Sequence, residues 1–135
     1  MINTFVFDTN ALISAHLLDK SKSRKAYNKA VDTGVLIYSA STFDEFAKTF
    51  IRSKFEKYLS LDKRMSVIRE FQARGALIEV GILVTASRDP KDNNFLELAV
   101  SANASCIITG DKDLLILNPF RNIPILNTVD FLNNF

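Results

Sequence analysis

Short apolar runs alternate with segments of helical periodicity along the whole chain, and this alternation constrains the fold more than any other feature. The apolar runs predict strands at residues 4–7, 35–38, 76–80, 106–109 and 123–126. The periodic segments predict helices at residues 10–18, 23–33, 41–53, 63–74, 90–100 and 128–135, with glycines ending two of them at residues 34 and 75. Strands separated by helices need crossover connections, which give a mostly parallel sheet covered on both faces. The predicted fold class is α/β, with three layers and a sheet of four to five strands, in a single domain spanning residues 1–135.

The composition is that of an ordinary globular domain. Apolar residues make up 47% and charged residues 24% of the 135 residues, which is enough for a substantial core. No apolar run approaches the roughly 18 residues of a membrane span, and the first residues lack the basic and apolar regions of a signal peptide. The one cysteine, Cys106, lies in an apolar run and is expected to be a buried, reduced thiol. These features predict a cytoplasmic protein that does not insert into membranes.

The net charge of +2 conceals an asymmetry between the two halves of the chain. Residues 1–74 contain 13 Lys and Arg against 8 Asp and Glu, whereas residues 75–135 contain 4 against 7. The basic residues concentrate at 21–29 and 52–74. A basic face beside an acidic centre suits a polyanionic substrate. The alternative, that these residues form solvated faces of surface helices, stays open because acids are interspersed among them.

Two aspartates follow predicted strands. Asp8 ends the first apolar run, and Asp111 comes soon after the fourth. The carboxyl ends of parallel strands meet at one edge of the sheet, so both carboxylates are expected there. Carboxylates gathered at such an edge repel one another and lose hydration, so they call for a cation, and oxygen ligands favour Mg²⁺ or Mn²⁺. The alternative for Asp8 is capping of the next helix, and Thr9 and Asn10 are expected to orient its side chain.

Glu45 and Asp92 each have an acidic residue nearby in the sequence, so the acid that caps a helix must be distinguished from the acid that belongs to the site. With Ser41 as the N-cap of the third helix, Asp44 falls at the third helical position, where an acid completes a capping box. Glu45 lies one position further and has no capping duty. We therefore assign Asp44 to structure and Glu45 to the site.

The second pair lies in the segment RDPKD. Asp89 precedes Pro90 and is the expected N-cap, with proline at the first helical position. Asp92 then falls in the first turn, where the helix dipole alone also favours a carboxylate. Its position at the sheet edge favours a role as a metal ligand over capping.

The last pair follows the strand at residues 106–109. Gly110 permits a tight bend, and turn formation alone is the alternative explanation for the aspartates after it. Asp111 lies nearest the strand end and is assigned as a ligand, with Asp113 as an auxiliary ligand. Thr109 is placed to hydrogen-bond a water or a neighbouring carboxylate.

Other chemistries fit the sequence less well. His16 is the only histidine and is expected to pack on or cap a helix, and Cys106 lies within a strand, so a cysteine–histidine nucleophile is not indicated. No glycine-rich phosphate loop is present in the sequence. A phosphatase of the haloacid dehalogenase type also begins with a strand and an aspartate, but it needs a second aspartate where this chain has Asn10. A response-regulator receiver needs an aspartate at the end of the third strand, where Val80 leads into Gly81.

Four motifs in a fixed order carry a family resemblance. They are FDTNALIS, SASTFDEF, RDPKDNNFLELA and TGDKDLL, and they span essentially the whole chain. In this order and spacing the chain resembles the PIN-domain family, and in particular the VapC-like ribonucleases of bacterial and archaeal toxin–antitoxin systems. The conserved acids of the family fall here on Asp8, Glu45, Asp92 and Asp111, with Asp113 as a frequent additional acid.

The resemblance implies a function. Family members have a compact parallel sheet with helices on both sides, bind Mg²⁺ or Mn²⁺ and cleave RNA; many pair with a small antitoxin, and many form homodimers. The implied mechanism is hydrolysis, in which one or two metal ions held by Asp8, Asp92 and Asp111 activate a water that attacks phosphorus. Glu45 either ligates metal or orients this water. The alternatives are the phosphatase and a catalytically idle domain that binds RNA or a partner protein, and roles in RNA processing and decay compete with that of a toxin.

Overall fold

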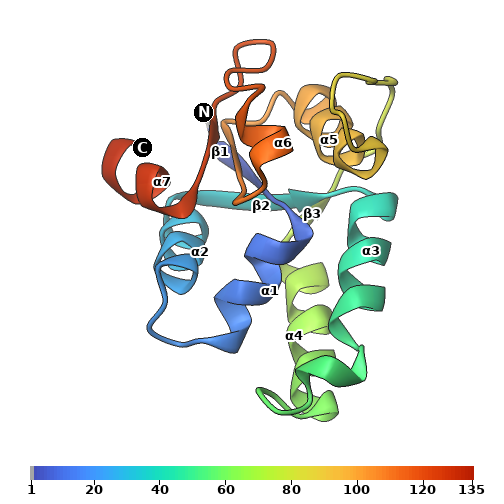
Figure 1. The fold of residues 1–135 in the computed structure, drawn as a ribbon, viewed down its shortest axis with the longest axis vertical. Helices are drawn as coiled ribbons and strands as arrows, with labels where there is room; N and C mark the ends of the chain where they lie inside the picture. The colour runs from blue at the N-terminus through green and yellow to red at the C-terminus, as the bar shows by residue number, and fades with distance from the viewer. Residues whose placement is uncertain (1) are drawn as a thin grey trace.

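A five-stranded parallel sheet forms the centre of the molecule in the computed structural model, which describes residues 2–135 (Figure 1). The strands are β1 (Asn3–Phe7), β2 (Gly34–Tyr38), β3 (Ala76–Leu77), β4 (Cys106–Ile108) and β5 (Ile125–Leu126). They lie in the order β3-β2-β1-β4-β5, and every neighbouring pair is parallel. The predicted α/β class with a mostly parallel sheet is confirmed.

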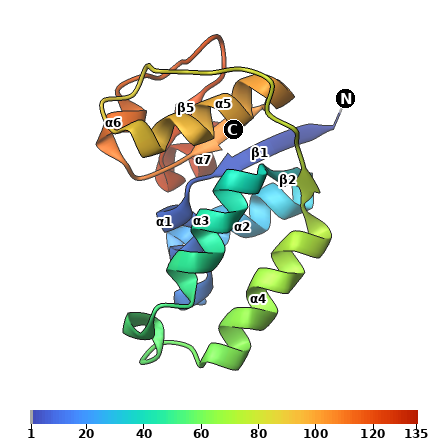
Figure 2. The same cartoon turned by 90° about the vertical axis from the view of Figure 1, so that its right-hand side faces the viewer.

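Helices cover both faces of this sheet (Figures 1 and 2). They are α1 (Thr9–Leu17), α2 (Lys22–Thr33), α3 (Ala40–Phe50), α4 (Leu61–Arg74), α5 (Asn93–Ala102), α6 (Lys112–Leu115) and α7 (Thr128–Asn134), with 3-10 turns η1 (Ser53–Phe55) and η2 (Pro90–Asp92). Helices α1, α2, α3, α4 and α7 contribute to one core and α5 and α6 to the other. The three layers are therefore as predicted. Between residues 2 and 135, none of the helices is both long and apolar enough to cross a membrane.

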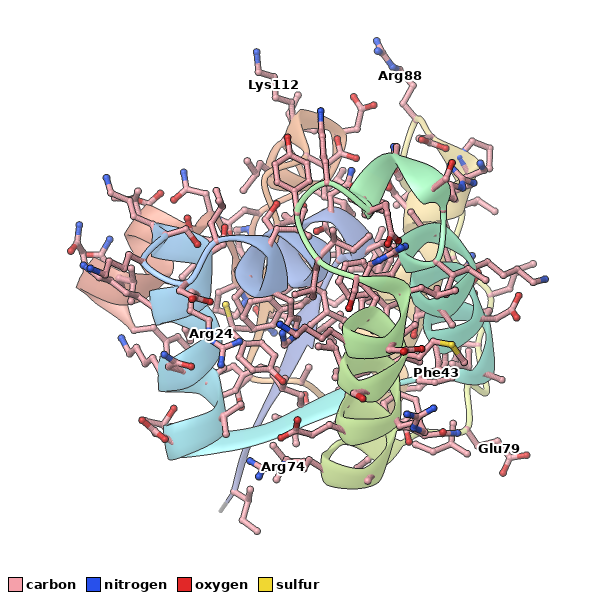
Figure 3. All side chains as sticks on the ribbon, turned by 90° about the horizontal axis from the view of Figure 1, so that it is seen from below. Arg24, Phe43, Arg74, Glu79, Arg88 and Lys112 are labelled. Carbon is pink, nitrogen blue, oxygen red and sulfur yellow. The ribbon has the colours of Figure 1, made fainter. Side chains whose placement is uncertain are left out.

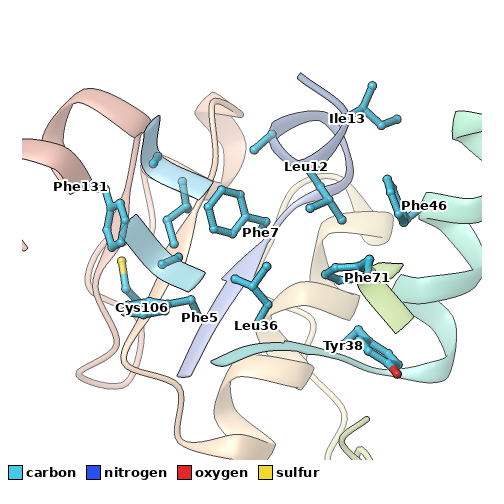
Figure 4. Packing of buried hydrophobic residues seen from close by; sticks show 14 of the residues in the cluster. Phe5, Phe7, Leu12, Ile13, Leu36, Tyr38, Phe46, Phe71, Cys106 and Phe131 are labelled. Carbon is cyan, nitrogen blue, oxygen red and sulfur yellow. The ribbon is translucent and has the colours of Figure 1, made fainter. Parts of the chain in front are cut away.

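The two cores follow from the alternation of side chains along the strands. Phe5 and Phe7 of β1 face the larger core, which also contains Cys106 and Phe131 (Figure 4), whereas Val6 faces the smaller one. Because both faces are covered, the buried positions of β1 and β4, from Phe5 to Phe7 and from Cys106 to Ile108, are apolar. Burial raises the pKa of the Cys106 thiol to about 12, as expected for a buried, reduced cysteine.

The register of the central strands determines which polar residues meet at the carboxyl edge of the sheet. Phe7 of β1 is paired with Ile108 of β4, and the backbone N–H of Asp8 donates to the carbonyl of Ile108 at 3.2 Å. Asp8 and Thr109 therefore leave neighbouring strands side by side. The chain places β2 and β3 on one side of β1, and β4 and β5 on the other. The carboxyl edge between β1 and β4 is therefore a topological switch point, where α/β proteins bind ligands.

The cap of α3 differs from the prediction. Ser39, not Ser41, is the N-cap: its hydroxyl accepts from the N–H of Thr42 at 3.2 Å, and the N–H of Ser39 donates to the Thr42 hydroxyl at 2.9 Å. Asp44 is therefore beyond the capping position and instead forms an exposed ion pair with Lys48 at 2.9 Å. The observed and predicted N-caps are both serines, two residues apart. Ser39 is the cap because it directly follows the end of β2. Asp44 remains a structural residue, but for another reason.

The remaining differences lie in the connections. The third strand covers only residues 76–77 of the predicted 76–80, and residues 78–87 form an extended connector without regular structure. The helix expected from Pro90 begins as η2 before continuing as α5, with Asp89 capping it through Lys91 N–H at 3.1 Å, as predicted. The short elements η1 and α6 were not predicted, because three or four residues carry too little periodicity to be recognised.

Gly34 has a steric role rather than the conformational role of a helix stop. Its backbone is extended, at φ −173°, a conformation open to any residue. A Cβ at this position, however, would lie 2.3 Å from the carbonyl oxygen of Asn3 and 2.8 Å from the ring of Phe5. Only glycine lets β2 approach β1 this closely.

Gly34→Ala is therefore expected to destabilise the protein by about 1–3 kcal/mol or more, because overpacking forces neighbouring backbone to move. Urea denaturation of the variant and of wild type measures the difference. Gly81→Ala is the matched control, since a Cβ at residue 81 would meet nothing within 4 Å. Equal stability of the two alanine variants would contradict the steric explanation.

Candidate metal centre at the carboxyl edge of the sheet

Three aspartates from separate elements meet at the carboxyl edge. Asp92 ends η2, Asp111 follows β4, and Asp113 lies in α6. One carboxylate oxygen from each lies within 4.8 Å of those of the other two. Asp92 is buried, whereas Asp111 and Asp113 are half-buried. The structure thus brings together three of the five acids assigned to the site from the sequence.

Asp8 lies beside this cluster and is linked to it by a threonine. The fully buried Thr109 hydroxyl donates to Oδ2 of Asp8 and accepts from the N–H of Asp111 at 2.9 Å. Oδ1 of Asp8 accepts from the N–H of Ala11 at 2.8 Å, so Asp8 also caps α1, as in the alternative interpretation. An ionised carboxylate offers about four lone-pair sites, and these two bonds leave the others free for a further ligand.

Glu45 approaches from α3 on the other side of Asp8. Its carboxylate accepts a hydrogen bond from the hydroxyl of Thr9, and its charge acts on Asp8. Thr9 was expected to orient Asp8; it orients Glu45 instead, because the first turn of α1 packs against α3. The structure therefore places Glu45 next to Asp8, outside the cluster of three aspartates.

The side chain of Asp92 forms no capping hydrogen bond. No backbone N–H at the start of α5 bonds to its carboxylate in the described part of the chain. Its partner is the hydroxyl of Ser87, at 3.4 Å. Ser87 lies in the irregular connector, where no local pattern marks it as a site residue. Asp92 still lies in the first turn of η2, where the helix dipole favours a carboxylate, and Asp89 caps η2 as predicted.

The carboxylates of the site destabilise one another when ionised. Burial raises the pKa of Asp92 to about 7, helped by a hydrogen bond with Asp111 and by the charges of Asp111, Asp89 and Asp8. Burial also raises the pKa of Asp8, with further contributions from Asp111 and Glu45, against the opposing hydrogen bonds from Thr109 and Ala11. Burial and the neighbouring acids together therefore disfavour the ionised forms of Asp8 and Asp92.

Cations of the protein do little to neutralise this charge. Within residues 2–135, the one ion pair to these acids joins Nε of Arg88 to Asp113 at 3.8 Å, and the Arg88 side chain is 88% exposed. Arg88 and Lys112 extend outward from the same side of the molecule (Figure 3), where a solvated cation contributes little. Buried, converging carboxylate oxygens with an uncompensated charge fit a hard divalent cation such as Mg²⁺ or Mn²⁺.

His16 lies away from the acids. It is in a separate cavity of about 540 Å³ between α2 and α4, where its ring makes an edge contact with Tyr27, at 4.7 Å between centroids. Arg24 donates to its Nδ1 at 3.2 Å, and burial together with this arginine lowers the pKa of His16 to about 4. The neutral ring therefore packs between helices, as predicted, and takes no part in the acidic site.

The comparison with known protein families assigns the chain. The family model described as PIN domain matches residues 4–113, which include every acid discussed above. The chain belongs to the PIN domain family. The resemblance inferred from the four sequence motifs is thus confirmed, and the phosphatase alternative has no support. No curated protein matches the chain in sequence.

Three solved structures share the fold over most of the chain. VapBC2 from Rickettsia felis, bound to a DNA fragment from its promoter, matches with a TM-score of 0.63 at 13% identity, covering 92% of this chain and 98% of that one. PAE2754 from Pyrobaculum aerophilum matches at 0.62 and 12% identity, covering 99% and 100%. DNA-bound VapBC from Salmonella typhimurium matches at 0.59 and 18% identity, covering 95% and 99%. At these identities the similarity concerns the fold of this PIN domain.

Proposed function

We propose that this PIN domain is a divalent-metal-dependent endoribonuclease that hydrolyses RNA phosphodiester bonds. The observation that carries the proposal is the cluster of Asp92, Asp111 and Asp113 beside Asp8, four carboxylates whose charge the described cations leave uncompensated. A site that costs stability in this way is typical of function rather than of packing. Membership of the PIN family and the sequence motifs supply the reaction type.

Each residue has a role in this proposal. Asp8, Asp92 and Asp111 hold Mg²⁺ or Mn²⁺, and Asp113 is an auxiliary ligand. The metal, when bound, supplies Lewis-acid stabilisation of the charge that develops at the scissile phosphate. Glu45, fixed by the Thr9 hydroxyl, either adds a ligand or orients the attacking water. Thr109 is a positioning residue, since its hydroxyl donates to the carboxylate of Asp8 and fixes its orientation.

We further propose that the protein is the toxin of a toxin–antitoxin pair, held inactive by a small antitoxin protein. The similarity in fold to the two VapBC structures supports this role. Growth arrest on expression, relieved by Asp8→Asn, would support the toxin role, and unaffected growth would count against it. Formation of a homodimer stays a prediction, to be checked by light scattering.

The proposed activity is tested with a labelled RNA pool incubated with Mn²⁺, with Mg²⁺ or with EDTA. Wild type is expected to cleave only with metal. Asp8→Asn is expected to lower the rate by about 100-fold or more, because Lewis-acid stabilisation is worth several kcal/mol and each 1.4 kcal/mol is tenfold in rate. Gel electrophoresis of the products measures both effects.

Asp44→Asn and Glu45→Gln form a matched pair for the same assay. The residues are adjacent in α3, but Asp44 pairs with Lys48 on the surface, whereas Glu45 faces Asp8. Asp44→Asn should cleave like wild type and Glu45→Gln should not. Calorimetric binding of Mn²⁺ without any RNA cleavage would instead indicate the catalytically idle alternative, and full activity of Asp8→Asn would overturn the site assignment.

A further inference from the structure

A polar groove of about 360 Å³ extends from the acidic site along α1. Asp8 and Asp111 form part of its wall at the metal centre. Away from them the lining includes Asn10 and Ser14 of α1 and Ser23 of α2, with residues of the β4–α6 loop and the start of α7 on the facing side. Its volume is in the range of about 300–1,000 Å³ that small-ligand sites occupy.

The lining has a distinct chemistry. The polar side chains of Asn10, Ser14, Ser23 and Thr128 form no hydrogen bond with any other residue in the described part of the chain, so their donors and acceptors face the groove or solvent. None of the residues that line it is aromatic, and none is Lys or Arg. Such a wall offers no stacking surface for a base and no strong charge for a phosphate. It offers hydroxyl and amide groups, which hydrogen-bond ribose hydroxyls and base edges.

We propose that this groove holds the nucleotide next to the scissile bond of a single-stranded RNA substrate, and selects it by hydrogen bonds to its ribose and base edge. The inference rests on the proposed function, since the groove gains this meaning from the metal centre at its end. A single strand is required because the base edges in a duplex are already paired. Lys20 and Lys22 are exposed and lie close in sequence to Ser23, which lines the groove. Their positive charges favour binding of the RNA phosphate backbone.

Gly110 allows the groove to be narrowed without disturbing the fold. It lines the groove, and a Cβ added there would meet nothing within 4 Å. Gly110→Leu is expected to raise KM for RNA about tenfold, equivalent to the loss of one or two hydrogen bonds, and to change the nucleotide preference on one side of the cleavage site.

Two further variants make the test independent of any local effect at residue 110. Gly81→Leu is the matched control, because a Cβ at residue 81 also meets nothing within 4 Å but this glycine lies outside the groove. Ser14→Leu narrows the groove from its other wall, on the exposed side of α1, and should reproduce the effect of Gly110→Leu, whereas Ser14→Ala should be much weaker. Thermal melting confirms that each variant is folded.

The readouts separate failure of this inference from failure of the proposed function. Cleavage kinetics and product sequencing are combined with fluorescence anisotropy of a labelled RNA hexamer on the Asp8→Asn protein, alone and with Gly110→Leu added. If wild type cleaves RNA but Gly110→Leu and Ser14→Leu keep its KM and nucleotide preference, the groove assignment is overturned and the nuclease stands. If wild type cleaves no RNA, the proposed function fails. In that case, hexamer binding unaffected by Gly110→Leu also overturns the groove, and binding weakened by it still supports an RNA-binding groove.

Discussion

Asp92→Asn is expected to lower RNA cleavage by about 100-fold or more and, in the absence of metal, to stabilise the folded protein. The loss of activity follows if Asp92 is a metal ligand, as proposed above. The gain in stability follows from electrostatics: the fold holds this carboxylate buried beside Asp111, which raises the pKa of Asp92 to about 7. Asparagine removes the charge and nearly preserves the shape.

The effect on stability has a defined pH dependence. The ordinary pKa of this aspartate in the unfolded chain is 3.8, so between about pH 4 and pH 7 the folded state binds more protons than the unfolded state. The contribution of Asp92 to folding stability therefore falls as the pH rises through this window and stays low above it. Asp92→Asn should melt several degrees above wild type at pH 8 without metal, and the difference should vanish near pH 4.

Thermal melts at pH 4 and pH 8, in EDTA and with Mn²⁺, measure this prediction. Added Mn²⁺ should stabilise wild type at pH 8 and should stabilise Asp92→Asn much less. Asp44→Asn is the control, because Asp44 lies on the surface and its exposed ion pair with Lys48 contributes little to stability. If metal-free Asp92→Asn is less stable than wild type at pH 8, the carboxylate is a structural group and the electrostatic argument is wrong.

Arg64→Ala is expected to lower the free energy of unfolding by about 3–5 kcal/mol, because it leaves three backbone carbonyls without their donor. The side chain is 1% exposed, although the sequence around it is rich in exposed charges. Its Nη1 donates to the carbonyls of Phe50, at 2.8 Å, and Arg52, at 3.0 Å, and its Nε donates to Leu59 at 2.9 Å. Arg64 is thus the group that satisfies the carbonyls at the end of α3.

The fourth hydrogen bond, to the carboxylate of Glu56, supplies the countercharge. Removing the guanidinium leaves three buried or half-buried carbonyls without this donor, and each orphaned carbonyl costs about 1–3 kcal/mol, partly recovered by solvent. Arg64→Lys should recover little, because an ammonium cannot reach groups spread around a planar guanidinium. Glu45 lies in the same helix, so the loss should also lower activity.

Urea denaturation measures the change in stability, and hydrogen exchange should show the loss of protection concentrated at the end of α3. Lys63→Ala is the matched control, since Lys63 precedes Arg64 in α4 but is exposed. A change below about 1 kcal/mol for Arg64→Ala would mean that water replaces the guanidinium at these carbonyls.

Features that depend on local periodicity were predicted from the sequence. The alternation of apolar runs and helical segments predicted the parallel sheet and its three layers, because each strand must bury both faces and each helix one. Predictions failed where the signal was weak or shared. The predicted third strand was too long, because the apolar residues of β3 continue into an irregular connector. The cap of α3 was placed at Ser41, since Ser39 and Ser41 are equally good caps and only β2 decides between them.

The site shows the same division. That Asp8 and Asp111 lie at one sheet edge follows from their positions after parallel strands, and the sequence predicted it. The relative position of the two carboxylates does not follow from the sequence, because it depends on the β1–β4 register and on the hydroxyl of Thr109. The contact of Ser87 with Asp92 was not predicted, because Ser87 lies in an irregular connector with no recognisable sequence pattern.

The sequence by itself therefore determined the family, the order of the secondary-structure elements and the edge at which the acids gather, since these depend on residue type and spacing along the chain. Tertiary structure alone decided which acids surround Asp92 and that Ser87 is its hydrogen-bond partner, whereas the capping role of Asp89 was already predicted from its position before Pro90. It also decided that Arg64 is buried while Lys63 beside it is exposed. The physical reason is that hydration and the partners of a charged group depend on what surrounds it in space, and neighbours in the chain do not specify those surroundings.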